Sequence, residues 1–148
     1  MTTEPLLLIS FGFLHLPTGI PPRADRLEDV RNRLRDPAAA RDILDLDATH
    51  PRVREIVLRT PGADTLLRNL VRYAEECEPR IVAIGCAEGR HRAPALVMLL
   101  AKRLRQRDVA GLRPVVSAAR ARRLSATSFQ STLLCSTATA SSTRCTRL

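Results

Sequence analysis

The stretch Ile81-Val82-Ala83-Ile84-Gly85-Cys86-Ala87-Glu88-Gly89-Arg90-His91-Arg92-Ala93 decides the fold. Its first four residues are apolar and predict a short buried strand. Gly85 is expected to break this strand, after which the chain turns through Cys86 to Gly89. A long helical pattern then runs to Arg107. A strand, a turn and a helix in this order are typical of an α/β domain.

The turn before the expected helix has the features of an anion-binding site. The first N–H groups of a helix have no partner within it, and the helix dipole adds about half a positive charge there. Helix starts ordinarily favour acidic side chains, yet this one carries arginines, which can bind phosphate with two parallel hydrogen bonds. We expect an oxyanion to bind at Cys86, Ala87, Glu88, Gly89, Arg90, His91 and Arg92. The alternative is a structural turn whose arginines only face water.

The rest of the chain up to Val116 predicts further strands and helices. Residues 6–9 form a strand pattern, and a Pro/Gly-rich loop follows at 17–22. Residues 25–36 fit either a helix or a short strand around 27–31. Helices are expected from Pro51, with Thr49 or His50 as the cap, to Thr60, and from Ala63 or Asp64 to Glu76; a last strand is expected at 114–116.

This alternation predicts a single α/β domain over residues 5–116, with a mainly parallel sheet flanked by helices. Residues 117–148 contain five of the 24 basic residues and no acid, and they are rich in Ser and Thr. Such a segment has too little apolar surface to offset the entropy lost on ordering. We therefore expect a disordered C-terminal tail over residues 117–148, and a body that is only mildly basic.

The composition also indicates where the protein is located and which cofactors it is not expected to bind. No apolar run approaches the roughly 20 residues of a membrane span, and the start of the chain does not resemble a signal peptide. We therefore expect a cytoplasmic protein without a membrane partner. The four cysteines form no CxxC pair, which argues against a zinc site or a disulfide framework. No metal and no cofactor are expected.

Cys86 and Arg92 have the C-x5-R spacing of cysteine-dependent phosphatases, in which a thiolate attacks a phosphate held by backbone N–H groups and an arginine. Those loops normally carry His before the cysteine and Ser or Thr after the arginine, whereas this chain has Gly85 and Ala93. The required general acid has candidates by residue type alone, namely Asp25, Asp29 and Asp47. We keep a phosphatase with Cys86 and Arg92 as the alternative and favour a domain without catalytic residues.

Several stretches together resemble the C-terminal domain of the RNase adapter protein RapZ and its small stand-alone bacterial relatives. They are Ser10–Phe13, Asp25, Asp29–Arg31, Asp36–Pro37, residues 51–67, Ile84–Cys86 and Gly89–Arg92. The resemblance implies a fold akin to a phosphofructokinase subdomain, binding of a phosphorylated amino sugar and of small regulatory RNA, and a homo-oligomer. The chain has no GxxxxGK[ST] pattern, so ATP binding is not implied for it.

The function expected is that of a sensor or adapter domain that binds a phosphorylated small molecule, with RNA or a regulatory protein as further partners. Ser10 and Gly12 follow the first strand at the edge where open α/β sheets bind ligands. Asp29 and Arg31, at the end of a neighbouring strand, are expected to orient the hydroxyl or amine groups of a sugar. Aromatic residues make up only 3% of the chain, so stacking platforms for RNA bases are scarce.

Overall fold

The computed structural model describes residues 5–34, 43, 45–107 and 113–116. Within them lies a four-stranded parallel sheet with the order β2-β3-β1-β4. The strands are β1 (Leu7–Gly12), β2 (Arg26–Asp29), β3 (Ile81–Cys86) and β4 (Arg113–Val116). The prediction of a single α/β domain with a parallel sheet is confirmed. The tail expected at 117–148 lies outside the described residues.

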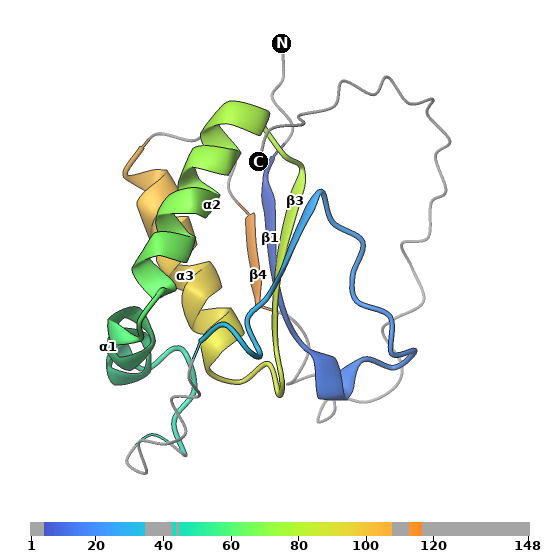
Figure 1. The fold of residues 1–148 in the computed structure, drawn as a ribbon, viewed down its shortest axis with the longest axis vertical. Coiled ribbons are helices and arrows are strands. Elements are labelled where there is room, and N and C mark those ends of the chain that lie inside the picture. Colours follow the sequence, from blue (N-terminus) through green and yellow to red (C-terminus); the bar gives the residue numbers. More distant parts are fainter. Residues whose placement is uncertain (1–4, 35–42, 44, 108–112, 117–148) are drawn as a thin grey trace.

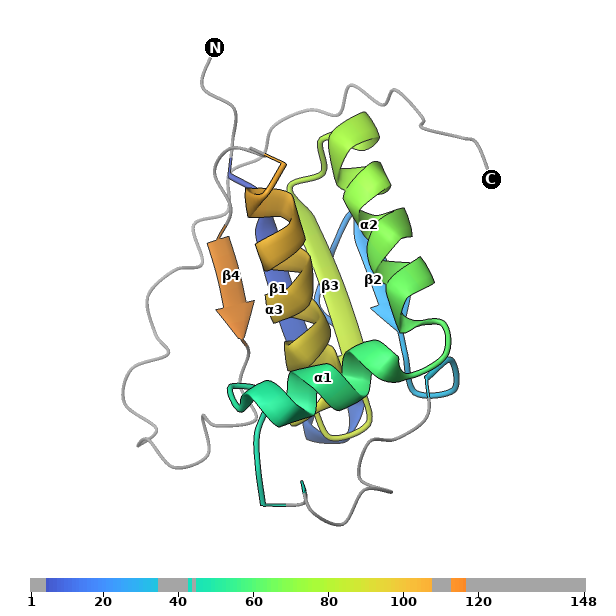
Figure 2. The ribbon, with the colours of Figure 1, turned by 90° about the vertical axis from the view of Figure 1, so that its left-hand side faces the viewer.

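Three α-helices cover one face of this sheet (Figure 1). They are α1 (Pro51–Arg59), α2 (Ala63–Cys77) and α3 (Arg92–Arg105), and a 3-10 turn, η1 (Phe13–His15), follows β1 directly. In Figure 2, α2 and α3 run side by side along the strands, and α1 crosses below them at the end to which the strand arrows point. The carboxyl ends of the strands, where ligands bind in such sheets, therefore meet α1 and the start of α3.

Alternation along the strands separates a helix-facing side from the opposite side of the sheet. Leu8, Val82 and Ile84 are fully buried and belong to the core that the helices close. The apolar stripes of α2 and α3 complete that core with Leu67, Leu70, Leu96, Leu100 and Leu104, each at most 1% exposed. Periodic apolar residues in the sequence therefore mark the packing faces correctly.

Strand boundaries differ from the sequence prediction. The first strand, predicted at residues 6–9, runs from Leu7 to Gly12, so Ser10 and Gly12 lie within β1 and do not follow it. Gly85 does not break β3: it pairs with Phe11 of β1 and Asp29 of β2, and the strand continues to Cys86. A Cβ on Gly85 would lie 2.4 Å from the Phe11 ring, so the missing side chain makes room for aromatic packing. In the ambiguous segment 25–36 the strand alternative is confirmed as β2, and the helix alternative is wrong.

Helix starts follow the predicted signals. His50 is the N-cap of α1, and its Nδ1 accepts a hydrogen bond from the Arg52 N–H at 3.3 Å. The Asp25 carboxylate accepts hydrogen bonds from the N–H groups of Arg80 and Ile81, both at 2.8 Å, and so fixes the start of β3. None of the described helices is long and apolar enough to cross a membrane.

Candidate functional site

The turn between β3 and α3 is held tightly against the end of β1. Gly89 has a positive φ of 71°, and a Cβ on it would lie 2.6 Å from the Gly12 nitrogen. Conversely, a Cβ on Gly12 would lie 2.4 Å from the Glu88 carbonyl carbon. The Leu14 N–H donates to the Ala87 carbonyl at 3.0 Å, which ties η1 to the same turn. Both glycines therefore serve close backbone packing.

The start of α3 offers unused backbone donors. Its N-cap residue, His91, makes no side-chain capping bond, and the first turn contains no acidic residue. In the described part of the chain, the N–H groups of Glu88, Arg90 and His91 donate to no backbone carbonyl. These donors and the helix dipole favour an anion at this end of the helix.

The two arginines of the turn have different environments. The Arg90 side chain is exposed and has no partner among the described residues, so its guanidinium is available to a ligand. Arg92 is 6% exposed, and its Nη1 donates to the carbonyls of Val30, Arg31 and Leu34 at 3.2, 3.0 and 2.8 Å. Arg92 therefore holds the segment after β2 against α3, and we assign it a positioning role.

The segment after β2 carries a fixed cationic group at the same edge of the sheet. Arg31 donates from Nε and Nη2 to the Asp29 carboxylate at 2.6 to 3.0 Å, and its guanidinium lies 3.7 Å from the centre of the Phe13 ring. The hydrogen bond from Arg31 lowers the pKa of Asp29, and the nearby positive charge adds to this effect. Both side chains are thereby held ionised and in one orientation beside η1.

The residues that the sequence predicts as ligand contacts fall into two groups, one accessible to solvent and one buried. Exposed or half-buried are Arg31, Asp29, Ala87, Glu88 and Arg90, whereas Ser10, Gly12, Cys86, Gly89, His91 and Arg92 are buried. Ser10 is fully buried, and its Oγ has no hydrogen-bond partner among the described residues. The imidazole Nε2 of His91 lies 2.9 Å from the Leu46 carbonyl oxygen. The buried group forms the support of the site, and the exposed group forms its surface.

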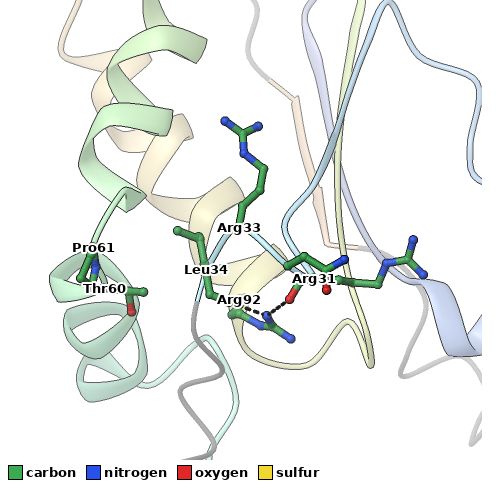
Figure 3. A pocket seen from close by; sticks show the side chains of 7 residues that line it. Arg31, Arg33, Leu34, Thr60, Pro61 and Arg92 are labelled. Atoms are coloured by element: carbon green, nitrogen blue, oxygen red, sulfur yellow. Dashed lines mark hydrogen bonds between the residues drawn. The ribbon is translucent and has the colours of Figure 1, made fainter.

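A cavity of about 590 Å³ lies beside this edge and contains residues that the sequence analysis did not select (Figure 3). It is lined by Arg31, Asn32, Arg33, Leu34, Thr60, Pro61 and Arg92. Its cations are largely engaged elsewhere: the Arg31 guanidinium points away from it toward η1, and Arg33 pairs with Glu28 at 2.5 Å. No periodic or motif signal marks Asn32 or Thr60, because the cavity forms between segments distant in sequence.

Cys86 lies at the end of β3 and is 3% exposed. Its Sγ accepts a hydrogen bond from the Gly89 N–H at 3.2 Å. The candidate general acids are engaged elsewhere. Asp25 binds the opposite end of β3, about 17 Å away at 3.3 Å per residue, and Asp47 bonds to Thr49. Asp29 is paired with Arg31.

The fold and this edge define an α/β domain whose candidate ligand surface lies at the carboxyl ends of a parallel sheet. The family model of the RapZ C-terminal domain matches residues 5–120, and the chain belongs to this family. The resemblance derived from the sequence motifs is thereby confirmed.

Within the matched segment, curated relatives are identical to this chain at about a third of the positions or more. A nucleotide-binding protein of Anaeromyxobacter dehalogenans (strain 2CP-C) is 40% identical over 106 residues, covering 66% of this chain and 35% of the relative. One of Acidiphilium cryptum (strain JF-5) is 32% identical over 112 residues, covering 70% and 36%. One of Mycobacterium tuberculosis (strain ATCC 25177 / H37Ra) is 35% identical over the same length. The chain spans about a third of the length of these relatives.

Proposed function

We propose that this domain is a sensor or adapter that binds a phosphorylated small molecule at the carboxyl edge of its sheet. One observation carries the proposal: the exposed Arg90 stands at a helix start whose backbone donors and dipole also favour an anion. Arg31, stacked on Phe13 beside the same turn, adds a second guanidinium. A phosphate bound there would receive charge-assisted hydrogen bonds.

Carboxylates at the same edge favour a ligand that also carries an amine. Glu88 is exposed within the turn, and Asp29 is half-buried beside Arg31. A phosphate alone would be repelled by Glu88, whereas the ammonium group of an amino sugar would be attracted to a carboxylate. An amino-sugar phosphate, the ligand that the family resemblance implies, therefore matches the mixed charge of this edge.

A nucleotide is the competing ligand class. The matched relatives are named nucleotide-binding proteins, but this chain corresponds to about a third of their length and lacks the GxxxxGK[ST] loop. The described structure offers no feature that selects a base. We therefore rank a nucleotide below an amino-sugar phosphate for this domain.

The macromolecular partners of the protein, its self-association and its cellular location remain predictions. The family resemblance implies regulatory RNA and a homo-oligomer, the composition predicts a cytoplasmic location, and a regulatory protein is a further expected partner. The exposed arginines suit phosphate backbones, but stacking surfaces for bases are scarce, since the chain has three Phe, one Tyr and no Trp. We propose RNA or protein recognition as a second role.

Calorimetric titration of the full chain with an amino-sugar phosphate tests the proposal. Arg90→Ala should weaken binding by about 1.5–3 kcal/mol, the range for a hydrogen bond to a charged group. Arg72→Ala is the matched control, because Arg72 is an equally exposed arginine on α2, away from the turn, and should leave the affinity unchanged. Equal affinities of the wild type and Arg90→Ala would reject the assignment.

A phosphatase is the second candidate function, and the hydrogen bond from the Gly89 N–H to the Cys86 sulfur favours it. The buried thiol and the carbonyl-bound Arg92 oppose it. We expect no hydrolysis of an aryl phosphate by the wild type, and a Cys86→Ser variant that differs only in stability. Turnover by the wild type that disappears in Cys86→Ser would establish the phosphatase instead.

A further inference from the structure

Arg31, in the turn after β2, has hydrogen-bond donors to spare. Its Nε and Nη2 donate to the Asp29 carboxylate at 2.6 to 3.0 Å, so the carboxylate occupies one side of the planar guanidinium. Among the described residues, Nη1 and the second N–H of Nη2 have no partner, and the side chain is 44% exposed. The two nitrogens present parallel N–H groups, which match two oxygens of a phosphate.

The Phe13 ring holds this guanidinium in place. The central carbon of the Arg31 guanidinium lies over the ring, 3.7 Å from its centre. At this distance a guanidinium is attracted to the ring by cation–π and stacking contacts. Phe13 and Asp29 restrain the same group from different directions, so the free N–H groups of Arg31 have a fixed orientation beside η1. Figure 3 shows the guanidinium pointing toward η1.

The Phe13 ring is itself fixed at the carboxyl end of β3. It makes an edge-to-face contact with Phe11, with 4.9 Å between the ring centres. Gly85 leaves the room for both rings, because a Cβ there would lie 2.4 Å from Phe11 and 2.6 Å from Phe13. The next residue, Leu14, donates its N–H to the Ala87 carbonyl at 3.0 Å. The ring is therefore anchored to the turn whose backbone donors favour an anion.

A second pair of the same kind lies at the other end of β2. The Arg26 guanidinium lies 4.9 Å from the centre of the Tyr73 ring, and it also binds a carboxylate, that of Glu28. Arg26 begins the strand, whereas Arg31 follows its carboxyl end, where ligands bind in such sheets. The two pairs share their chemistry and differ in their place, so the Arg26 pair provides a control for the Arg31 pair.

We propose that Phe13 is a positioning residue of the ligand site, which directs the free N–H groups of Arg31 toward an oxyanion bound at the start of α3. This inference rests on the proposed function, since it requires the anion to lie at that turn. The Asp29 carboxylate balances the charge of Arg31, so the contact depends on the direction of the N–H groups more than on net charge. Phe13 acts through Arg31, because its ring has no polar group to offer an anion.

An NMR titration of the full chain with inorganic phosphate, at constant ionic strength, tests the proposal through a double-mutant cycle. Phe13→Leu should raise the dissociation constant about threefold, as expected for loss of an exposed cation–π contact. Arg31→Gln should raise it about tenfold, because a charge-assisted hydrogen bond is lost. Phe13→Leu added to Arg31→Gln should change it by less than about twofold, since the ring then has no guanidinium to orient.

Two further variants serve as controls in the same titration. Phe13→Tyr keeps an aromatic ring and should bind phosphate as the wild type does. Tyr73→Leu removes the ring of the other pair, which is half-buried as Phe13 is, and should leave the affinity unchanged. Together these variants separate the effect of a ring at the ligand site from the effect of losing an aromatic side chain elsewhere.

Two results would overturn the role of Phe13 while leaving the site in place. One is a Phe13→Leu variant that binds phosphate as tightly as the wild type, when Arg90→Ala binds it more weakly. The other is a Phe13→Leu change that weakens binding equally with and without Arg31→Gln, because the ring would then act on the fold and not through Arg31. Unchanged phosphate affinity in Arg90→Ala would instead reject the proposed site, and the role of Phe13 with it.

Discussion

The turn after β3 and the turn after β2 lie next to each other at the carboxyl edge of the sheet, yet they are built differently. The first is packed against β1 through Gly12 and Gly89, with Cys86, Gly89 and His91 buried. The second, from Val30 to Leu34, presents three consecutive exposed side chains, at residues 31–33. Arg92 joins them by donating from the first turn to three carbonyls of the second. The comparison shows that Arg92, the arginine of the C-x5-R spacing, is a buried support of the site and not part of its exposed surface.

The largest effect is expected where the first turn is tightest. Gly89→Ala would place a Cβ against the Gly12 backbone and force an alanine into a left-handed conformation. These penalties should lower the free energy of unfolding by about 2–4 kcal/mol. Urea denaturation would measure it, with Asn32→Ala in the exposed second turn as a control that should change stability by less than about 0.5 kcal/mol. Equal stabilities would contradict the tight packing of the first turn.

Arg92→Met should destabilise the protein by about 2–3 kcal/mol, because carbonyls that are buried with Arg92 lose their donor. Arg90→Met should leave stability nearly unchanged, since the Arg90 side chain is exposed. The pair can be compared by thermal unfolding of the two variants at one pH. If Arg90→Met were the more destabilising change, the roles assigned to the two arginines would have to be exchanged.

These contrasts also show which parts of the structure the sequence could predict. The apolar periods of α2, α3 and β3 predict the helices and the central strand, because each depends on local alternation and on burial of one face. No local sequence pattern indicates that Arg90 is exposed whereas Arg92 is buried and bonded to carbonyls. This difference depends on carbonyls 58 to 62 residues earlier in the chain, which only the folded sheet brings to the start of α3.

Gly85 and Asp29 illustrate the same limit. A glycine after four apolar residues predicts a strand end, but here it gives room to two aromatic rings and lets β3 continue to Cys86. Asp29 is predicted as a ligand contact, and the structure shows its carboxylate bound to Arg31 at the expected edge. The sequence therefore locates the candidate site, whereas the partners of its charged groups follow from tertiary contacts.

The smallest effect concerns the ion pair of the second turn. Arg31 lowers the pKa of Asp29, so the pair stabilises the folded state above the ordinary Asp pKa of about 3.9. That stabilisation is lost as the pH falls through the lowered pKa. Arg31→Gln should therefore be slightly less stable than the wild type at neutral pH, and the difference in urea midpoint should vanish in acid. A difference that grows in acid would have the wrong sign for this pair.

An NMR titration of the full chain with an amino-sugar phosphate tests the central claim most directly, because each backbone amide reports separately. If the anion binds at the start of α3, the largest shift changes should occur at Glu88, Arg90 and His91, with smaller ones at Arg31. Changes confined to Asn32, Arg33 and Thr60 would place the ligand in the neighbouring cavity and contradict the site proposed here. The absence of any change at saturating ligand would contradict ligand binding itself.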